Sequence, residues 1–331
     1  MKLSVLYGCD DNYAPYTGVS MTSLFENNKD VEEITVYLAA MGFSKENRDK
    51  FQQLEEQYKR KIVFLDTDKA VATINEYGCG SWNGSVAAWL RLFVLDQILE
   101  HVEKLIWIDS DTIVGPGIKN IINTISEGNW PVAAVCDFLA IRERYRLGFL
   151  EDEPYFNSGV IIFNMLELRH NKTFPVMMSY IRENVRLSKT ADQDMLNLFF
   201  GRQIHKLPPK YNMQCFIKAY KAEDYFAVYQ WSPEAFYSKQ EMIEAIENPV
   251  ISHFLRFLGD YPWTNGKNYH PAKKIYEEWK SKSLWKDHLG APPRKEIAFQ
   301  VEKKLFQILP RRTFLRLFFW YTNRKSPRTP Q

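Results

Sequence analysis

The first 110 residues alternate between short apolar runs and longer segments with the pattern of helices. The apolar runs lie at 3–7, 33–39, 61–66 and 104–109. The helix-like segments between them lie at 16–28, 45–60 and 86–99. Strands and helices in alternation form mostly parallel sheets that helices cover on both faces. The sequence therefore predicts an α/β chain with a Rossmann-like, mostly parallel central sheet.

A pair of aspartates closes the last of these runs, in LIWIDSDTIV at 105–114. Ligands of such sheets bind at the carboxyl ends of the strands. Asp109 and Asp111 are two residues apart, and in an extended segment their side chains point to the same side. Two converging carboxylates suit Mg²⁺ or Mn²⁺, which keep phosphate oxygens among their ligands.

The same Asp-x-Asp spelling occurs elsewhere in the chain. It recurs at Asp66/Asp68 and at Asp192/Asp194. The segment at 61–68 also follows an apolar run, so local context separates the three only partly. From the residues alone, a metal site and a solvated turn at the end of a strand remain equally open for Asp109 and Asp111.

The C-terminal residues differ from the rest of the chain in charge. Residues 291–331 contain ten Lys and Arg and two Glu, a net +8, so residues 1–290 carry −5 of the overall +3. Within 310–330 the cations are interleaved with aromatic and leucine side chains, which is typical of segments that lie on anionic lipid. Since the basic residues do not continue into the body, we expect no nucleic acid partner.

Apolar residues upstream of that stretch recur at helical spacing: Ile297, Val301, Leu305 and Ile308. A helix that docks on the protein is therefore the alternative to a surface anchor. We expect a folded domain over residues 1–290 and a basic, aromatic-rich helical tail over residues 291–331. The tail is expected to bind an anionic membrane surface.

The cysteines are widely spaced and form no Cys-x-x-Cys pair, which indicates a reducing compartment: Cys9, Cys79, Cys136 and Cys215. The chain starts without the pattern of a secretory signal. No apolar run approaches the roughly eighteen residues that a membrane-spanning helix needs. We expect a cytoplasmic protein that is peripheral on the inner face of the cell membrane.

Several stretches, in order, resemble glycosyltransferase family 8, the retaining GT-A enzymes that include bacterial lipooligosaccharide galactosyltransferases and glycogenin. They are VLYGCDDNYAPYTGVSMTSLFEN, AAWLRLFVLDQILEHVEKLIWIDSDTIV, YFNSGVIIFNM, ADQDMLNLFF, VISHF and YPW, and together they span residues 3–263. The ordered set is specific, whereas one such motif would not be. The resemblance implies a GT-A fold over residues 1–290.

The resemblance also implies an activity. It is the retaining, metal-dependent transfer of a hexose, glucose or galactose, from a UDP-sugar to a glycan or glycolipid acceptor in bacterial surface polysaccharide synthesis. A glycoside hydrolase would need two opposed carboxylates and no metal, and the uridine and metal motifs disfavour it. The alternative is a degenerate nucleotide-sugar-binding or membrane scaffold protein without turnover.

The resemblance further implies the residues of the site. Asp109, Asp111 and His253 match the ligands of a Mn²⁺ ion, with Mg²⁺ possible. The residues that match the family's substrate-binding positions are Cys9, Asp10, Asn12, Tyr13, Arg91, Asp109, Ser110, Asn157, Ser158 and Gly259. Without the resemblance, an Asp-Asp-Asn run after a strand would be interpreted as a turn or a helix cap. A lone Arg91 in an apolar segment requires a partner in either case.

The segment ADQD matches the residues beside the transferred sugar. By resemblance, Asp192 binds donor hydroxyls and Gln193 lies beneath the anomeric carbon, where an amide oxygen can stabilise positive charge. Asp194 is the candidate for an assisting carboxylate. The structural alternative, an acidic helix N-terminus ahead of MLNLFF, is compatible with these roles.

One position departs from the family pattern. The family ends this motif with Lys-Pro-Trp, and its lysine binds the donor diphosphate. This chain has Tyr261 at the position of the lysine, in HFLRFLGDYPW. Arg256, Lys267 and Lys273 are the nearby cations that can replace it, although a solvent-facing loop explains each of them equally well.

Overall fold

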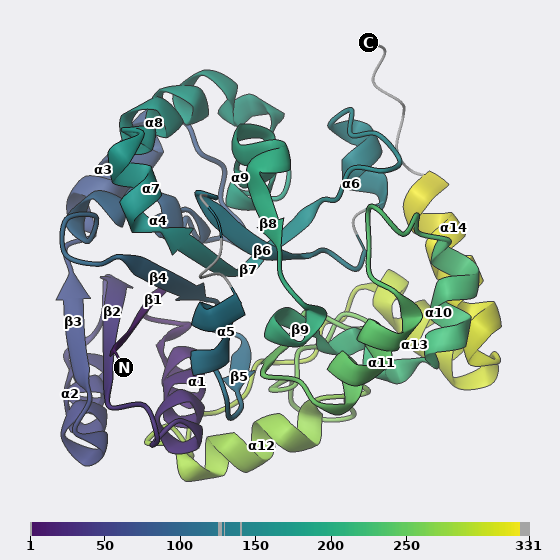
Figure 1. Cartoon of the computed structure of the whole chain (residues 1–331). Helices are drawn as coiled ribbons and strands as arrows, with labels where there is room; N and C mark the ends of the chain where they lie inside the picture. The colour runs from purple at the N-terminus through teal and green to yellow at the C-terminus, as the bar shows by residue number, and fades with distance from the viewer. Residues whose placement is uncertain (1, 125–127, 129, 140, 325–331) are drawn as a thin grey trace.

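The computed structural model describes residues 2–324 except 125–127, 129 and 140. Its central sheet has seven strands in the order β3-β2-β1-β4-β7-β6-β8 (Figure 1). They are β1 (Lys2–Asp10), β2 (Glu33–Met41), β3 (Lys61–Leu65), β4 (Lys104–Ile108), β6 (Val132–Cys136), β7 (Phe156–Asn164) and β8 (Ile204–Lys206).

These strands run parallel except for β7, which pairs antiparallel with both β4 and β6. The predicted mostly parallel sheet is thus confirmed. Every residue of β7 is buried, and residues 160–163 form a continuous apolar run, as expected for a strand covered on both faces. Its antiparallel direction shows the limit of the alternation pattern, which covers only the first 110 residues.

Helices lie on both faces of the sheet, with α7, α8 and α9 on one face and α1 on the other (Figure 1). In chain order the α-helices of the described residues are α1 (Ala14–Asn27), α2 (Lys45–Tyr58), α3 (Asp68–Glu76), α4 (Leu90–Phe93), α5 (Lys119–Thr124), α6 (Ile141–Arg146), α7 (Met165–His170), α8 (Thr173–Asn184), α9 (Asp192–Phe200), α10 (Ala222–Tyr229), α11 (Lys239–Glu247), α12 (Lys273–Lys282), α13 (Ile297–Ile308) and α14 (Arg311–Arg324).

The single helix predicted over residues 86–99 is wrong. The segment consists of the 3₁₀ turn Ala87–Trp89, the short α4 and the 3₁₀ turn Leu95–Gln97. Residues 89–95 are all buried, so tertiary contacts on every side outweigh helical periodicity here. One such contact belongs to Arg91, whose Nη2 lies 2.9 Å from Asp109 Oδ1.

A small second sheet adjoins the end of β4. It has the order β5-β10-β9, with β5 (Thr112–Val114) antiparallel to β10 (Ile251–His253) and β9 (Met213–Gln214) parallel to β10. The β5–β10 pairing sets His253 opposite Thr112, the residue after Asp111. This sheet therefore joins the aspartates to the C-terminal third of the chain.

The chain ends in two helices, α13 and α14, which we call the C-terminal helix pair. Phe306 of α13 and Phe314 and Leu315 of α14 are buried in the same core as the central sheet. The helical spacing noted from Ile297 to Ile308 is confirmed by α13. Within the described residues, no helix combines the length and apolar character needed to cross a bilayer. The domain boundary at residue 290 stays a prediction.

Candidate functional site

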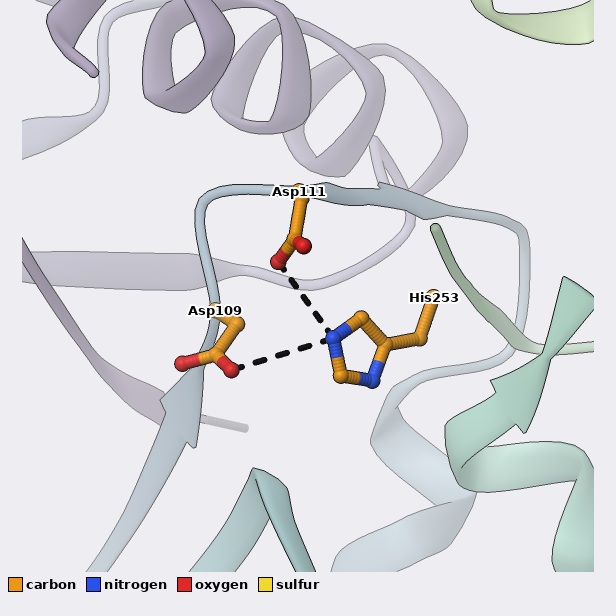
Figure 2. Close-up of side chains that lie close together, drawn as sticks. All are labelled: Asp109, Asp111 and His253. Atoms are coloured by element: carbon orange, nitrogen blue, oxygen red, sulfur yellow. Dashed lines mark ion pairs between the residues drawn. The ribbon is translucent and has the colours of Figure 1, made fainter. Parts of the chain in front are cut away.

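Two carboxylates and an imidazole meet at the carboxyl end of β4 (Figure 2). His253 Nε2 lies 3.3 Å from Asp111 Oδ1 and 3.8 Å from Asp109 Oδ2. One ligand atom of each residue lies within 4.8 Å of those of the other two. Asp109 follows β4, Asp111 precedes β5, and His253 ends β10. The pairing of β5 with β10 thus brings together residues that are distant in sequence.

Asn212 orients the imidazole of His253, because its Oδ1 lies 2.9 Å from His253 Nδ1. With the proton on Nδ1, the ring donates to Asn212 and turns the Nε2 lone pair toward Asp109 and Asp111. A Cβ at Gly159 would lie 2.2 Å from Cε1 of this ring, so only glycine fits there. The absence of a side chain at Gly159 therefore allows the His253 ring to lie against the backbone of β7.

The charges of this cluster are compatible with a bound cation. Burial raises the pKa of Asp109, Arg91 opposes that rise, Asp111 adds to it, and the net shift is upward. Burial lowers the pKa of His253, but Asp111 and Asp109 outweigh it and the net shift is again upward. Two carboxylates and an imidazole suit Mn²⁺ or Mg²⁺ in donor type, and a cation would relieve the repulsion between the aspartates. The residues present fit the expected metal.

Arg91 links the metal cluster to a second carboxylate. Its Nη2 lies 2.9 Å from Asp109 Oδ1, and its Nε lies 2.9 Å from Asp192 Oδ2. The guanidinium also lies over the ring of Trp107, 4.5 Å from its centroid, and donates to the carbonyl of Ser158. Burial raises the pKa of Asp192 to about 7, with Arg91 lowering it and Asp109 raising it. The buried arginine thus has the partners that its sequence context requires.

Gln193 has a defined orientation at the same cavity. Its Oε1 accepts from Asn157 Nδ2 at 3.2 Å and from the Ser158 backbone N–H at 3.0 Å. Its Nε2 donates to Asp137 Oδ2 at 3.1 Å and to Tyr155 Oη at 3.4 Å. With all four contacts made, the amide cannot flip without losing them, so the direction of its oxygen is determined.

An unusual backbone conformation precedes this residue. Ala191 has φ 51° and ψ −130°, outside the regions that an alanine ordinarily adopts. It ends the loop before α9, and it lines the cavity together with Asp192 and Gln193. Asp192 is the first residue of α9, so the predicted helix N-terminus is confirmed.

Asp194 lies in a different environment. It is fully buried and is not among the described residues that line the cavity. Its carboxylate accepts from Tyr155 Oη at 2.6 Å and from the Lys189 N–H at 2.7 Å, and it also pairs with Arg146. The remaining pair, Asp66 and Asp68, is exposed: Asp66 Oδ1 accepts the Asp68 N–H at 2.9 Å, as in a turn that starts a helix.

Two adjoining cavities surround these groups. The larger, of ≈ 470 Å³, contains the metal cluster, Arg91, Asn157, Ser158, Asp192 and Gln193. The smaller, of ≈ 250 Å³, is lined by Cys9, Asp10, Asn12, Tyr13 and Ser110. Both share Arg91, Asp109 and Asp111. All the predicted substrate-binding residues except Gly259 therefore line one continuous space.

The smaller cavity lies where β1 meets α1. Asp10 Oδ1 accepts the Tyr13 N–H at 3.1 Å, so the turn expected from an Asp-Asp-Asn run is present in the cavity wall. Thr17 Oγ1 lies 2.7 Å from Ser110 Oγ and 3.0 Å from Cys9 Sγ, which ties this turn to the loop after β4. The Asp-Asp-Asn run thus forms the expected turn and also lines the cavity in which a substrate-binding role was predicted.

Gly259 faces the C-terminal helix pair. It has φ +83°, and a Cβ there would lie 2.6 Å from the ring of Phe299 in α13. It does not line either of the two cavities among the described residues. The structure thus explains this glycine by backbone conformation and packing, and its part in substrate binding stays a prediction.

Of the three cations near the missing lysine, Arg256 is the one that reaches the cavity. Its guanidinium lies 5.0 Å from the ring centroid of Tyr261, and its Nη2 donates to Asn83 Oδ1 at 3.2 Å. Arg256 and Tyr261 both line the larger cavity. Lys267 instead lies over the ring of Tyr269, and Lys273 Nζ pairs with Glu277 Oε1 at 3.5 Å.

Two residues of the site were not predicted from the sequence. Asp137 is buried, follows the apolar run of β6, and holds both Asn157 and Gln193 by its Oδ2. A carboxylate directly after an apolar run was the available signal, the same one that singled out Asp109. Asn212, which orients His253, lies in a short 3₁₀ segment and carries no comparable signal.

Comparison with known proteins gives consistent matches. The family model described as glycosyl transferase family 8 matches residues 4–266. General stress protein A of Bacillus subtilis (strain 168) is 26% identical over 286 residues, which are 86% of this chain and 94% of the relative. Lipopolysaccharide 1,2-glucosyltransferase of Escherichia coli (strain K12) is 25% identical over 309 residues, covering 91% of this chain and 84% of the relative.

Among solved structures, the galactosyltransferase LgtC, in complex with donor and acceptor sugar analogs, superposes with a TM-score of 0.65. The match covers 86% of this chain and 96% of LgtC at 18% sequence identity. At that identity the likeness shows the fold alone. The predicted GT-A fold is confirmed.

Proposed function

The chain belongs to glycosyltransferase family 8, and we propose that it is a retaining, metal-dependent hexosyltransferase. It moves glucose or galactose from a UDP-sugar to a glycan or glycolipid acceptor in bacterial surface polysaccharide synthesis. The name of its relative, lipopolysaccharide 1,2-glucosyltransferase, supports a hexose donor and an acceptor of this type.

One observation carries the proposal. The metal cluster, the Arg91–Asp192 pair and the oriented amide of Gln193 share one cavity, and that cavity adjoins the one lined by Asp10 and Asn12. A nucleotide diphosphate sugar needs such a sequence of subsites: polar groups for the nucleoside, a cation for the diphosphate, and carboxylate and amide groups for the sugar.

Asp109, Asp111 and His253 hold Mn²⁺, or Mg²⁺, in this proposal. An ion held by these residues would supply positive charge for the diphosphate of the departing UDP. Asn212 keeps His253 in the tautomer that a metal requires, because it accepts the Nδ1 proton. Arg91 bridges Asp109 and Asp192 and opposes the rise in their pKa values that burial causes.

The remaining polar groups act on the sugar. Asp192 accepts hydrogen bonds from donor hydroxyls, and Gln193 presents its amide oxygen beneath the anomeric carbon, where positive charge builds up. The acceptor hydroxyl attacks from the face that UDP leaves: its oxygen bonds to the anomeric carbon, the bond to UDP breaks, and the hydroxyl proton passes to the departing phosphate. Asp194 takes no part in this step, since Arg146, Tyr155 and two backbone N–H groups occupy it. We propose that Asp194 holds the loop before α9.

Arg256 supplies the cation that Tyr261 does not. Its guanidinium lies in the cavity wall with Asp111, and its Nε has no hydrogen-bond partner among the described residues. A planar guanidinium can bind two phosphate oxygens at once. The absence of the family lysine is the sequence feature that favours a scaffold protein, so the position of Arg256 disfavours that alternative.

We further propose that the protein is cytoplasmic and peripheral on the inner membrane face, with residues 291–331 as the contact. Exposed Arg316, Leu317 and Trp320 on α14 combine cationic and apolar character on one helix. Such a helix suits the interface of an anionic bilayer.

Calorimetric titration of UDP into the purified protein tests the function, first with Mn²⁺ and then with EDTA. We expect binding that depends on the metal, and a repeat with UDP-glucose and UDP-galactose then ranks the donors. Lys267→Met serves as the control for Arg256→Met, which we expect to weaken UDP binding about tenfold through loss of a charge-assisted contact. If no uridine nucleotide binds in either condition, the scaffold alternative replaces the transferase.

A further inference from the structure

Helix α14 forms part of the wall of the larger cavity. Phe318 and Thr322 line this space together with the metal cluster and Gln193. Phe319 contacts the ring of Tyr229 in α10 edge-on, with 5.0 Å between centroids, and Tyr229 also lines the cavity. Helix α14 of the C-terminal helix pair therefore forms one side of the larger cavity.

A second, apolar groove lies between α13 and α14. Both helices lie at the edge of the molecule (Figure 1). Its volume is ≈ 360 Å³, and its walls include Val301 and Leu305 of α13 and Leu317 and Trp320 of α14. Glu302 is the single charged residue among the described residues that line it. Phe318 lines both this groove and the larger cavity, so the two are neighbours across one ring.

Contacts of α13 connect the groove to the loop that contains Tyr261. Lys303 Nζ of α13 pairs with Asp260 Oδ2 at 2.7 Å, and the two side chains are 9% and 0% exposed. Phe299 of the same helix packs on Gly259. Asp260 and Gly259 belong to the loop that carries Tyr261 into the cavity, so α13 is attached to the site by a buried ion pair and by packing.

The charge of α14 indicates what kind of molecule would fit. The helix Arg311–Arg324 has no acidic residue. Arg311 lies over the ring of Phe306, and Arg312 Nε lies 3.9 Å from Asp224 Oδ1, whereas Arg316 is exposed beside Leu317. An apolar groove on a helix that also carries an exposed guanidinium suits an amphiphile with an apolar chain and an anionic group.

We propose that the groove between α13 and α14 binds the hydrocarbon chain of an anionic, lipid-linked acceptor, whose sugar reaches the larger cavity past Phe318. This inference rests on the proposed function. The occupant is a single chain rather than the bilayer, because the groove is walled by two helices and adjoins the larger cavity, with the ring of Phe318 as their common wall. The C-terminal helix pair is then a specificity element of the enzyme in addition to a membrane contact.

Binding of monomeric dodecyl phosphate to the full-length protein tests this proposal, with inorganic phosphate as the probe that lacks a chain. UDP and Mn²⁺ are present, and the amphiphile is kept below its micelle concentration. We expect calorimetry to detect the dodecyl compound only. Leu317→Gln should weaken its binding at least fivefold. The matched control is Leu187→Gln, since Leu187 and Leu317 are 45% and 46% exposed and Leu187 lies far from the groove in sequence.

The midpoints of thermal unfolding of Leu317→Gln and Leu187→Gln must be alike for the binding comparison to hold. If Leu317→Gln is destabilised, Val301→Gln repeats the test at a half-exposed position of the opposite wall. If the protein binds UDP but not dodecyl phosphate, the groove proposal is overturned and the transferase stands. If the groove variants lose only binding to phosphatidylglycerol vesicles, the surface contacts the bilayer and the proposal is likewise overturned. Loss of UDP binding in the wild type would remove both.

Discussion

The segments 109–111 and 192–194 share the spelling Asp-x-Asp, yet the structure uses them in opposite ways. Asp109 and Asp111 both face the cavity and share His253 as a neighbour. Asp192 faces the cavity, whereas Asp194 is directed into the core toward Tyr155. The difference follows from the backbone. Asp109 and Asp111 flank a bend between β4 and β5 that leaves both side chains directed toward His253 (Figure 2). Residues i and i+2 of a helix, in contrast, are separated by about 200° around its axis.

The Asp-x-Asp spacing therefore predicts the directions of its two carboxylates only when the secondary structure around it is known. The first pair follows a strand and can converge on one ion. The second pair starts α9, so one carboxylate serves the cavity and the other the packing of the helix N-terminus. Substitutions in the two segments should therefore separate loss of activity from loss of stability.

The largest effect is expected at Asp111. Asp111→Asn should lower hexose transfer by about 10³-fold or more, equivalent to about 4 kcal/mol, because the metal loses a charged ligand. Thermal unfolding without metal should change little, since one of two neighbouring carboxylates is removed. Transfer and unfolding are measured on the same preparation. Full activity of the variant in EDTA would exclude a metal mechanism.

Asp194→Asn should show the reverse pattern. Its buried carboxylate accepts from Tyr155 and the Lys189 backbone and pairs with Arg146, so we expect a loss of about 3 kcal/mol in the free energy of unfolding. At a temperature where the variant is folded, its transfer rate should stay within a few-fold of the wild type. Denaturant unfolding and kinetics give the two numbers. A stable but inactive variant would restore Asp194 as an assisting carboxylate.

We expect the ionisation of Asp192 to change how the free energy of unfolding depends on pH. Burial raises its pKa from 3.8 to about 7 in the folded protein. Between these values the folded state holds a proton that the unfolded state has lost, so the stability of the metal-free protein falls as pH rises from about 4 to about 7. The total change is a few kcal/mol at most.

Denaturant unfolding of Asp192→Asn across that range should lack this component. A steeper loss of stability in the wild type than in the variant is the expected sign. The same slope in both proteins would mean that Arg91 keeps Asp192 ionised throughout.

The smallest effect is expected at the third Asp-x-Asp pair. Asp68→Asn should change both stability and transfer by less than about 0.5 kcal/mol, because Asp68 is exposed at the start of α3. It is the matched control for the other substitutions, since the chemical change is identical. A large effect on transfer would mean that the surface at 66–68 belongs to the reaction.

Local features account for what could be predicted at the site. The end of an apolar run located Asp109, and the resemblance of ADQD to the family motif located Asp192. The arrangement of Asp137 and Asn212 could not be foreseen in the same way. Both act on partners in other parts of the chain, Asp137 on Gln193 and Asn212 on His253, and no local pattern records such a pairing.

Local sequence patterns specify the alternation that produces the sheet, the position of Asp109 and Asp111 at a strand end, and the helical character of α13. These patterns depend on intervals of a few residues, because the backbone of a helix or strand sets the direction of each side chain. The family follows from an ordered set of motifs along the chain. Tertiary packing alone places Asp194 in the core, Arg256 beside Tyr261, and α14 in the wall of the larger cavity. These outcomes depend on which distant side chains compete for the same space and charge, and packing settles that competition.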